Sequence, residues 1–263
     1  MSAVELHWEQ SGPPDAPAVL LGSSLGTTLE MWSPVLPGLA DCRRIVRFDH
    51  RGHGRSPIAE GPYDMADLGG DVVALLDRLG LDRACYVGAS LGGMIGLWLA
   101  AHASTRIEGL VCICSSAYLP PAEAWAARAA SVRDAGSVAA VADAVLARWF
   151  TPGYAERHPD VITWMGAMLR DTSPEGYVAC CGAIERMDLR DDLARITAPT
   201  LAIGAAEDQA ISPEHSRAIA AGVSGARVEI MAHGAHLAAI ERAQEVTALI
   251  ERHLEGVHER STA

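Results

Sequence analysis

The residues best suited to chemistry lie in a Gly-x-Ser-x-Gly segment at positions 88–92, with Ser90 at its centre. The apolar residues 84–87 before it are typical of a short buried strand, and residues 94–102 after it are typical of a helix. A serine at such a sharp turn has strained backbone geometry and an exposed hydroxyl, and the glycines let neighbouring backbone pass closely. The segment therefore predicts that Ser90 is a nucleophile. The alternative is that it is only a turn residue.

A serine hydroxyl becomes a strong nucleophile only when a base takes its proton and a third group orients that base. Asp208 follows the apolar segment 200–204, which is typical of a strand, so it can serve as the orienting carboxylate. The adjacent Glu207 is the alternative. Because the carboxyl ends of parallel strands meet at one edge of a sheet, we expect Asp208 to lie close to Ser90.

The candidate base is His236, in the loop between an expected strand at 227–231 and the last helix. His233 in the same loop is the alternative. The chain order serine, carboxylate, histidine is one of the orders in which such a triad occurs. We therefore predict that Ser90, Asp208 and His236 form a catalytic triad for nucleophilic acyl transfer.

Acyl transfer also needs two hydrogen-bond donors for the oxyanion that develops on the attacked carbonyl. We expect one to be the backbone N–H of Leu91, directly after the nucleophile. The other is expected in the loop 22–28, after the first buried strand, where we favour the backbone N–H of Leu25. Ser24 is the alternative donor and a candidate substrate-binding residue.

Composition narrows the class of protein. The chain has 263 residues and a net charge of −12, which suits one large α/β domain and argues against binding to nucleic acid or an anionic membrane. All 21 basic residues are arginine, so a lysine Schiff base and a P-loop lysine are excluded. The six cysteines form no C-x-x-C pair, which fits buried free thiols in a reducing compartment. With no signal-peptide pattern and no apolar run of about 18 residues, we expect a cytoplasmic protein without a membrane span.

The order of the expected elements predicts an α/β fold, with a mostly parallel sheet and helices on both faces. The alternation of strands and helices stops between residues 118 and 190, where helical patterns and aromatic residues gather. We predict a core of residues 1–117 and 191–263 and an inserted helical lid, 118–190, that sets substrate choice. Trp149 is the candidate pocket wall, unless it belongs to the lid's own core.

One further motif, residues 48–56, places two histidines in a loop after an expected strand. His50 and His53 are of a type that could do chemistry. Our interpretation is that they belong to a tight loop held by Asp49 and Arg51.

Taken together, these motifs resemble the α/β-hydrolases, and among them the 3-oxoadipate enol-lactonases. The general similarity lies in residues 48–56 and 88–93, in Asp208 and in the Gly-x-His loop of His236. The narrower similarity covers nearly the whole chain and lies in residues 24–32, 148–152 and 177–189. Two departures concern the oxyanion loop and the lid: Ser23 stands where this group has Asn, and Glu-Arg at 185–186 reverses the expected order of charges.

The resemblance implies hydrolysis of an enol-lactone ring to 3-oxoadipate, with no metal or organic cofactor and a small anionic lactone as substrate. Ser90 is expected to attack the lactone carbonyl with His236 as base, and water activated by His236 to release the acyl enzyme. Other possibilities on the same scaffold are an esterase, a carbon–carbon bond hydrolase or a cofactor-free perhydrolase. A non-catalytic ligand sensor is the alternative of another class. The sequence does not indicate an oligomeric state.

This lactone carries an acetate arm, so the resemblance also implies a cation in the lid. Without lysine, arginine is the side chain that can bind a carboxylate with two parallel hydrogen bonds. Arg128, Arg133, Arg148 and Arg186 are flanked by apolar or aromatic residues. We favour Arg133, at the end of the first expected lid helix.

Overall fold

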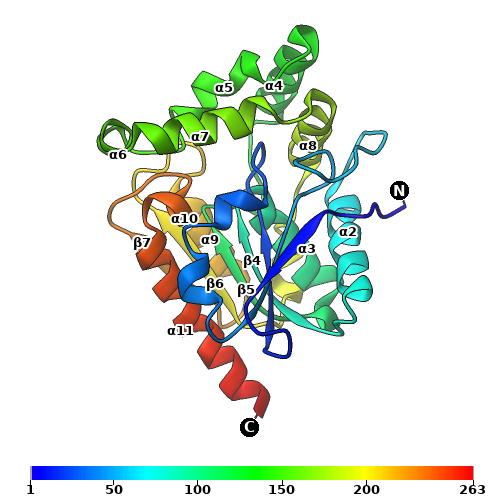
Figure 1. The fold of residues 1–263 in the computed structure, drawn as a ribbon. Coiled ribbons are helices and arrows are strands. Elements are labelled where there is room, and N and C mark those ends of the chain that lie inside the picture. Colours follow the sequence, from blue (N-terminus) through cyan, green and yellow to red (C-terminus); the bar gives the residue numbers. More distant parts are fainter. Residues whose placement is uncertain (1, 263) are drawn as a thin grey trace.

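The computed structural model describes residues 2–262, and side chains through residue 259. Within these residues the centre is a seven-stranded sheet of order β1-β3-β2-β4-β5-β6-β7 (Figure 1). β1 pairs with β3 in the antiparallel direction, and the other neighbouring pairs are parallel. The strands are β1 (Trp8–Ser11), β2 (Ala18–Gly22), β3 (Arg44–Phe48), β4 (Ala84–Ala89), β5 (Ile107–Ile113), β6 (Thr200–Ala205) and β7 (Arg227–Met231). The mostly parallel sheet expected from the sequence is confirmed.

Helices fill most of the chain between the strands. They are α1 (Leu36–Leu39), α2 (Met65–Arg78), α3 (Leu91–His102), α4 (Ala122–Ala135), α5 (Ala139–Leu146), α6 (Pro152–Arg157), α7 (Pro159–Arg170), α8 (Pro174–Arg186), α9 (Pro213–Gly222), α10 (Ala238–Glu241) and α11 (Ala243–Thr262). Short 3₁₀ helices are η1 (Leu29–Trp32), η2 (Ser104–Arg106) and η3 (Leu193–Arg195). Among the described residues, no helix combines the length and apolar character that crossing a membrane requires.

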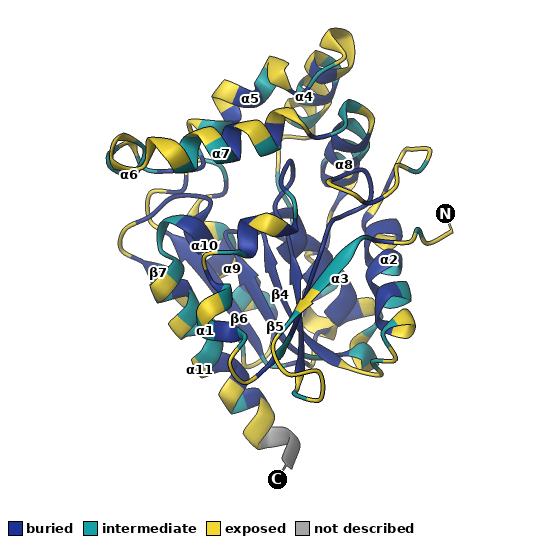
Figure 2. Cartoon of the chain, viewed as in Figure 1, coloured by how far each residue is buried: buried dark blue, intermediate teal, exposed yellow. Residues whose placement is uncertain are grey.

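Two consecutive residues of β5 show that helices cover both faces of the sheet. Successive residues of a strand point to opposite faces. A Cβ atom on Gly109 would lie 2.7 Å from Val257 of α11, whereas the next residue, Leu110, reaches within 2.8 Å of a Cβ built on Gly96 of α3. The helices α11 and α3 therefore pack on opposite faces. This double cover explains why every residue of β2, β4 and β6 is buried (Figure 2).

Residues 118–190, which we name the helical segment, lie between β5 and β6 and contain α4 to α8. These helices lie together at one end of the sheet (Figure 1). The two connections to the core run side by side, because Tyr118 and Asp188 form an antiparallel bridge and the Leu189 N–H donates to the Ala117 carbonyl. The two connections that join the helical segment to the sheet are thus hydrogen-bonded to each other.

Candidate active site

The turn between β4 and α3 holds Ser90 in a backbone conformation that non-glycine residues rarely adopt, with φ 52° and ψ −114°. Its N–H donates to the Ile113 carbonyl. The flanking glycines are required by packing: a Cβ on Gly88 would lie 2.3 Å from the Gly92 backbone, and one on Gly92 would lie 2.1 Å from the Gly22 carbonyl oxygen. The motif therefore brings β2, β4 and α3 close enough together to raise Ser90 at the end of the strand.

His236 lies between Ser90 and Asp208. Its Nε2 is 3.0 Å from Ser90 Oγ and its Nδ1 is 2.9 Å from Asp208 Oδ2, and all three residues are buried. The other carboxylate oxygen accepts hydrogen bonds from the N–H groups of Ala210 and Ile211. Because a carboxylate only accepts, the ring proton lies on Nδ1, and the lone pair of Nε2 faces the serine hydroxyl. This arrangement can take the proton of Ser90.

The two alternative residues lie together on the surface. His233 Nδ1 is 3.7 Å from Glu207 Oε1, and both side chains are exposed. Ser90 is contacted by His236, and the His236 ring is contacted by Asp208. The structure thus brings together the residues that the sequence favoured.

In the loop 23–28, one backbone N–H group without a partner among the described residues lies between two N–H groups that donate hydrogen bonds. The Ser24 N–H donates to Met31 Sδ, and the Gly26 N–H donates to His53 Nε2. The Leu25 N–H has no hydrogen-bond partner among the described residues. The Leu91 N–H is the first of α3 and so has no intrahelical acceptor. Leu25 and Leu91 are thus available as the two oxyanion donors.

A small pocket of about 50 Å³ opens onto Ser90. From the core it is lined by Ser24, Leu25, Ser90, Ala210, Ile211 and His236, and from the helical segment by Leu119, Trp125, Arg128, Val145, Arg148, Trp149 and Tyr177. The volume is that of one or two water molecules. The pocket lies between the core and the helical segment, and residues of both line it.

Two arginines from the helical segment give this pocket its charge. The guanidinium of Arg128 lies 4.4 Å from the ring centre of Trp125, and Arg148 Nε donates to the Ala144 carbonyl. Burial, followed by the neighbouring positive charge of Arg128, lowers the pKa of Arg148. Among the described residues neither arginine has a carboxylate partner within ion-pair distance, and Arg128 hydrogen-bonds the Tyr177 hydroxyl. Two cations without a carboxylate partner at one pocket favour an anionic ligand.

Arg133, which the sequence analysis favoured as the carboxylate ligand, does not line the pocket of Ser90. Arg133 is exposed and lines a separate groove of about 720 Å³, together with Arg186 and the loop 58–62. Each residue of a helix turns by about 100°, so positions 128 and 133 of α4 face about 140° apart. The packing of α4 turns Arg128 toward Ser90 and Arg133 away from it.

Trp149 and Glu241 join the helical segment to the loop of the candidate base. Trp149 is buried and lines the pocket, and its carbonyl accepts from the Leu237 N–H. The Glu241 carboxylate accepts from the N–H groups of Thr151 and Ala235. Sequence reasoning missed Glu241 because its partner Thr151 lies 90 positions away and no motif links the two.

The fold and this site together define the class of protein. Residues 17–135 match the family model described as alpha/beta hydrolase fold. The chain belongs to the α/β-hydrolase family.

Three individual proteins show which members of this family the chain is similar to. The chain is 34% identical over 248 residues to 3-oxoadipate enol-lactonase 2 of Acinetobacter baylyi, covering 94% of this chain and 92% of that protein. It is 33% identical over 248 residues to a Variovorax paradoxus protein with the provisional name carbamate hydrolase RutD, covering 90% and 91%. The crystal structure of the enol-lactonase from Burkholderia xenovorans superposes with a TM-score of 0.93 at 38% identity, covering 96% and 97%. The resemblance found in the sequence is confirmed.

Proposed function

We propose that this chain is a serine hydrolase that opens an enol-lactone ring, converting 3-oxoadipate enol-lactone and water into 3-oxoadipate. The observation that carries the proposal is the buried contact of His236 with both Ser90 and Asp208, in a pocket that is also lined by two arginines without a carboxylate partner. The names of the enol-lactonase relatives support the choice of substrate.

The reaction begins when His236 takes the proton of Ser90 and the serine oxygen attacks the lactone carbonyl. The oxyanion that forms accepts hydrogen bonds from the N–H groups of Leu25 and Leu91. Collapse breaks the ring C–O bond and leaves an acyl group on Ser90, and the enolate takes the proton from the His236 imidazolium. Tautomerisation to the ketone makes ring opening effectively one-way. Water, losing a proton to His236, then cleaves the acyl enzyme.

The two arginines supply a local positive charge in a protein whose net charge is negative. A net charge of −12 repels an anionic substrate at long range, so its carboxylate needs a local cation. Arg128 and Arg148 reach the pocket from α4 and from the turn after α5, on the helical wall. We therefore assign them to the acetate arm of the lactone, opposite the attacked carbonyl. Residues 118–190 then act as a lid, whose movement enlarges the pocket for entry.

The decisive experiment compares turnover of the enol-lactone, of p-nitrophenyl acetate and of a simple carbamate by the purified protein. The kcat/KM on the lactone is expected to exceed that on the neutral ester, because only the lactone carries a carboxylate that the two arginines can bind. The carbamate is expected to react more slowly than either. A carbamate that reacts fastest, or a lactone that is not hydrolysed, would overturn the proposed substrate.

A further inference from the structure

Two buried histidines have no part in the proposed reaction. His50 and His53 lie in the loop after β3, are almost completely buried and do not line the pocket of Ser90. Each ring is instead directed at the loop 23–28, which carries the Leu25 N–H. Their contacts with that loop fix the proton positions on both rings.

The two rings are held in opposite tautomers. His50 Nε2 lies 2.9 Å from the Ser23 carbonyl oxygen, which can only accept, so Nε2 carries the proton. His53 Nε2 accepts from the Gly26 N–H at 3.0 Å, so its proton lies on Nδ1, which faces the Arg51 carbonyl at 3.2 Å. Burial lowers the pKa of His53 and lowers that of His50 to about 4. Both rings therefore stay neutral at neutral pH, and His53 keeps its accepting lone pair.

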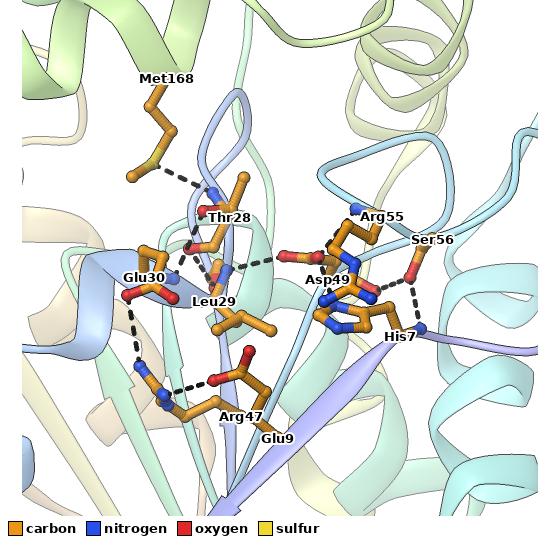
Figure 3. Close-up of polar contacts among 11 residues, drawn as sticks. His7, Glu9, Thr28, Leu29, Glu30, Arg47, Asp49, Arg55, Ser56 and Met168 are labelled. Atoms are coloured by element: carbon orange, nitrogen blue, oxygen red, sulfur yellow. Dashed lines mark hydrogen bonds and ion pairs between the residues drawn. The ribbon is translucent and has the colours of Figure 1, made fainter.

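The loop after β3 binds the oxyanion loop, which is the loop 23–28, at two places, and it binds the adjoining residue Leu29 at a third. His50 binds the Ser23 carbonyl, His53 binds the Gly26 N–H, and Asp49 Oδ1 accepts from the Leu29 N–H at 2.8 Å. Figure 3 shows the third contact, with Asp49 also accepting from the Arg55 N–H. Leu25 lies between the first two contacts.

The orientation of the Leu25 amide follows from the peptide planes around it. The Ser24 carbonyl accepts from both the N–H and the hydroxyl of Thr27. In a trans peptide the C=O and N–H point in opposite directions, so the Leu25 N–H points away from Thr27. His53 fixes the next plane, between Leu25 and Gly26, and His50 fixes the one between Ser23 and Ser24. The free amide is thus held from both sides.

We propose that His53, assisted by His50, is a positioning residue that holds the Leu25 N–H where the reaction's oxyanion forms. This role rests on the proposed serine hydrolase function, because the oxyanion concerned is the one that forms when Ser90 attacks the carbonyl. The predicted consequence is selective: loosening this amide affects the transition state and leaves ground-state binding of substrate nearly unchanged.

The test compares His53→Leu with His53→Gln. Both variants remove the ring, and only glutamine retains an oxygen that can accept from the Gly26 N–H. Against p-nitrophenyl acetate, His53→Leu is expected to lower kcat by about 10- to 100-fold at unchanged KM, and His53→Gln to recover most of the loss. Inhibition by phenylboronic acid, which forms a tetrahedral adduct on the serine, is expected to weaken by the same factor.

Ser56→Ala is the matched control, because Ser56 hydrogen-bonds the Asp49 carbonyl and the His7 N–H in the same loop without touching the oxyanion loop. It is expected to lower thermal stability and leave kcat unchanged. The variants His50→Leu and His50→Gln test the contact of His50 with the Ser23 carbonyl in the same way. They provide the deciding comparison if His53→Leu does not fold.

Equal kcat in the leucine and glutamine variants, or an equal loss of kcat in Ser56→Ala, would overturn the positioning role. A different result would be that the wild-type protein does not hydrolyse the ester through Ser90. It would overturn the proposed function first, and the positioning role with it.

Discussion

Two loops of this molecule each carry a pair of histidines, and the partners of each ring decide its use. In the loop after β7, His236 has a carboxylate on one nitrogen and a hydroxyl on the other. In the loop after β3, His50 and His53 bind backbone groups in a closed environment. A carboxylate stabilises the imidazolium that forms when a ring takes a proton, whereas an enclosed ring facing backbone stays neutral. The same side chain is a candidate base in one loop and a structural contact in the other.

The largest effect is expected at the nucleophile. Ser90→Ala is predicted to lower kcat by about 10⁴–10⁶, and adding His236→Ala is predicted to cost little more, because nucleophile and base act as a unit. Steady-state kinetics and thermal unfolding of the single and double variants check both statements.

The second histidine of the loop after β7 provides the control. His233→Ala removes an exposed side chain that only faces Glu207, so its activity is expected to remain that of the wild type. Full activity in Ser90→Ala would exclude the covalent mechanism, and loss of activity in His233→Ala with retention in His236→Ala would reassign the base.

The next effect is expected at the orienting carboxylate. Asp208→Asn is predicted to lower kcat by about 10⁴, since an amide that donates to Nδ1 leaves the proton on Nε2, facing Ser90. Glu207→Gln, in the neighbouring exposed position, is predicted to have no such effect. Kinetics of the two variants on p-nitrophenyl acetate separate the roles, and a larger loss in Glu207→Gln would contradict the assignment to Asp208.

The sheet and the triad could be predicted because they depend on local signals. Buried parallel strands appear as continuous apolar runs, and the glycines around Ser90 mark a close approach of β2, β4 and α3 that no Cβ permits. Residues placed just after such strands then meet at one edge, as Asp208 and His236 do. The expected loop around His50 and His53 is also present, with Arg51 paired to Asp71 and Asp49 accepting from backbone.

The pocket wall could not be predicted in the same way. Which arginine of α4 reaches Ser90 depends on how that helix is turned against α8, and the many small residues of α4 give no marked apolar stripe to read. The contact of Glu241 with Thr151, and those of His50 and His53 with the oxyanion loop, join segments far apart in the chain. Such contacts are set by tertiary packing, which a single sequence does not display.

A moderate effect is expected at the pocket arginines. Arg128→Ala and Arg148→Ala are each predicted to lower kcat/KM on the anionic lactone by roughly 10- to 150-fold, through the loss of a charged hydrogen bond worth about 1.5–3 kcal/mol. Hydrolysis of neutral p-nitrophenyl acetate is expected to change little. Arg133→Ala on the same helix is the matched control, because that side chain faces another groove. A lactone-specific loss in Arg133→Ala alone would assign the carboxylate to Arg133 instead of Arg128 and Arg148.

The smallest effect is expected on the free energy of unfolding at acid pH. Its measurement tests whether His50 and His53, in the loop after β3, are neutral in the folded protein. Burial lowers the pKa of His50 from 6.5 to about 4 and also lowers that of His53, so the unfolded chain binds more protons than the folded one below about pH 6.5. The contribution of the two neutral histidines to the free energy of unfolding is therefore fully present above that pH. It is lost as the pH decreases toward 4. From His50 alone, the free energy of unfolding at pH 5.5 is expected to lie below its value at pH 7.5 by on the order of 1 kcal/mol.

Urea unfolding of the wild type and of His50→Gln at the two pH values isolates this contribution, because the other titrating groups are common to both proteins. The variant is expected to be less stable at pH 7.5 but to lose less stability on acidification, by on the order of 1 kcal/mol. An equal pH dependence in the two proteins would mean that His50 titrates alike in the folded and unfolded chain. The ring would then be able to take a proton, as proposed for His236, and the contrast between the two loops would lose its physical basis.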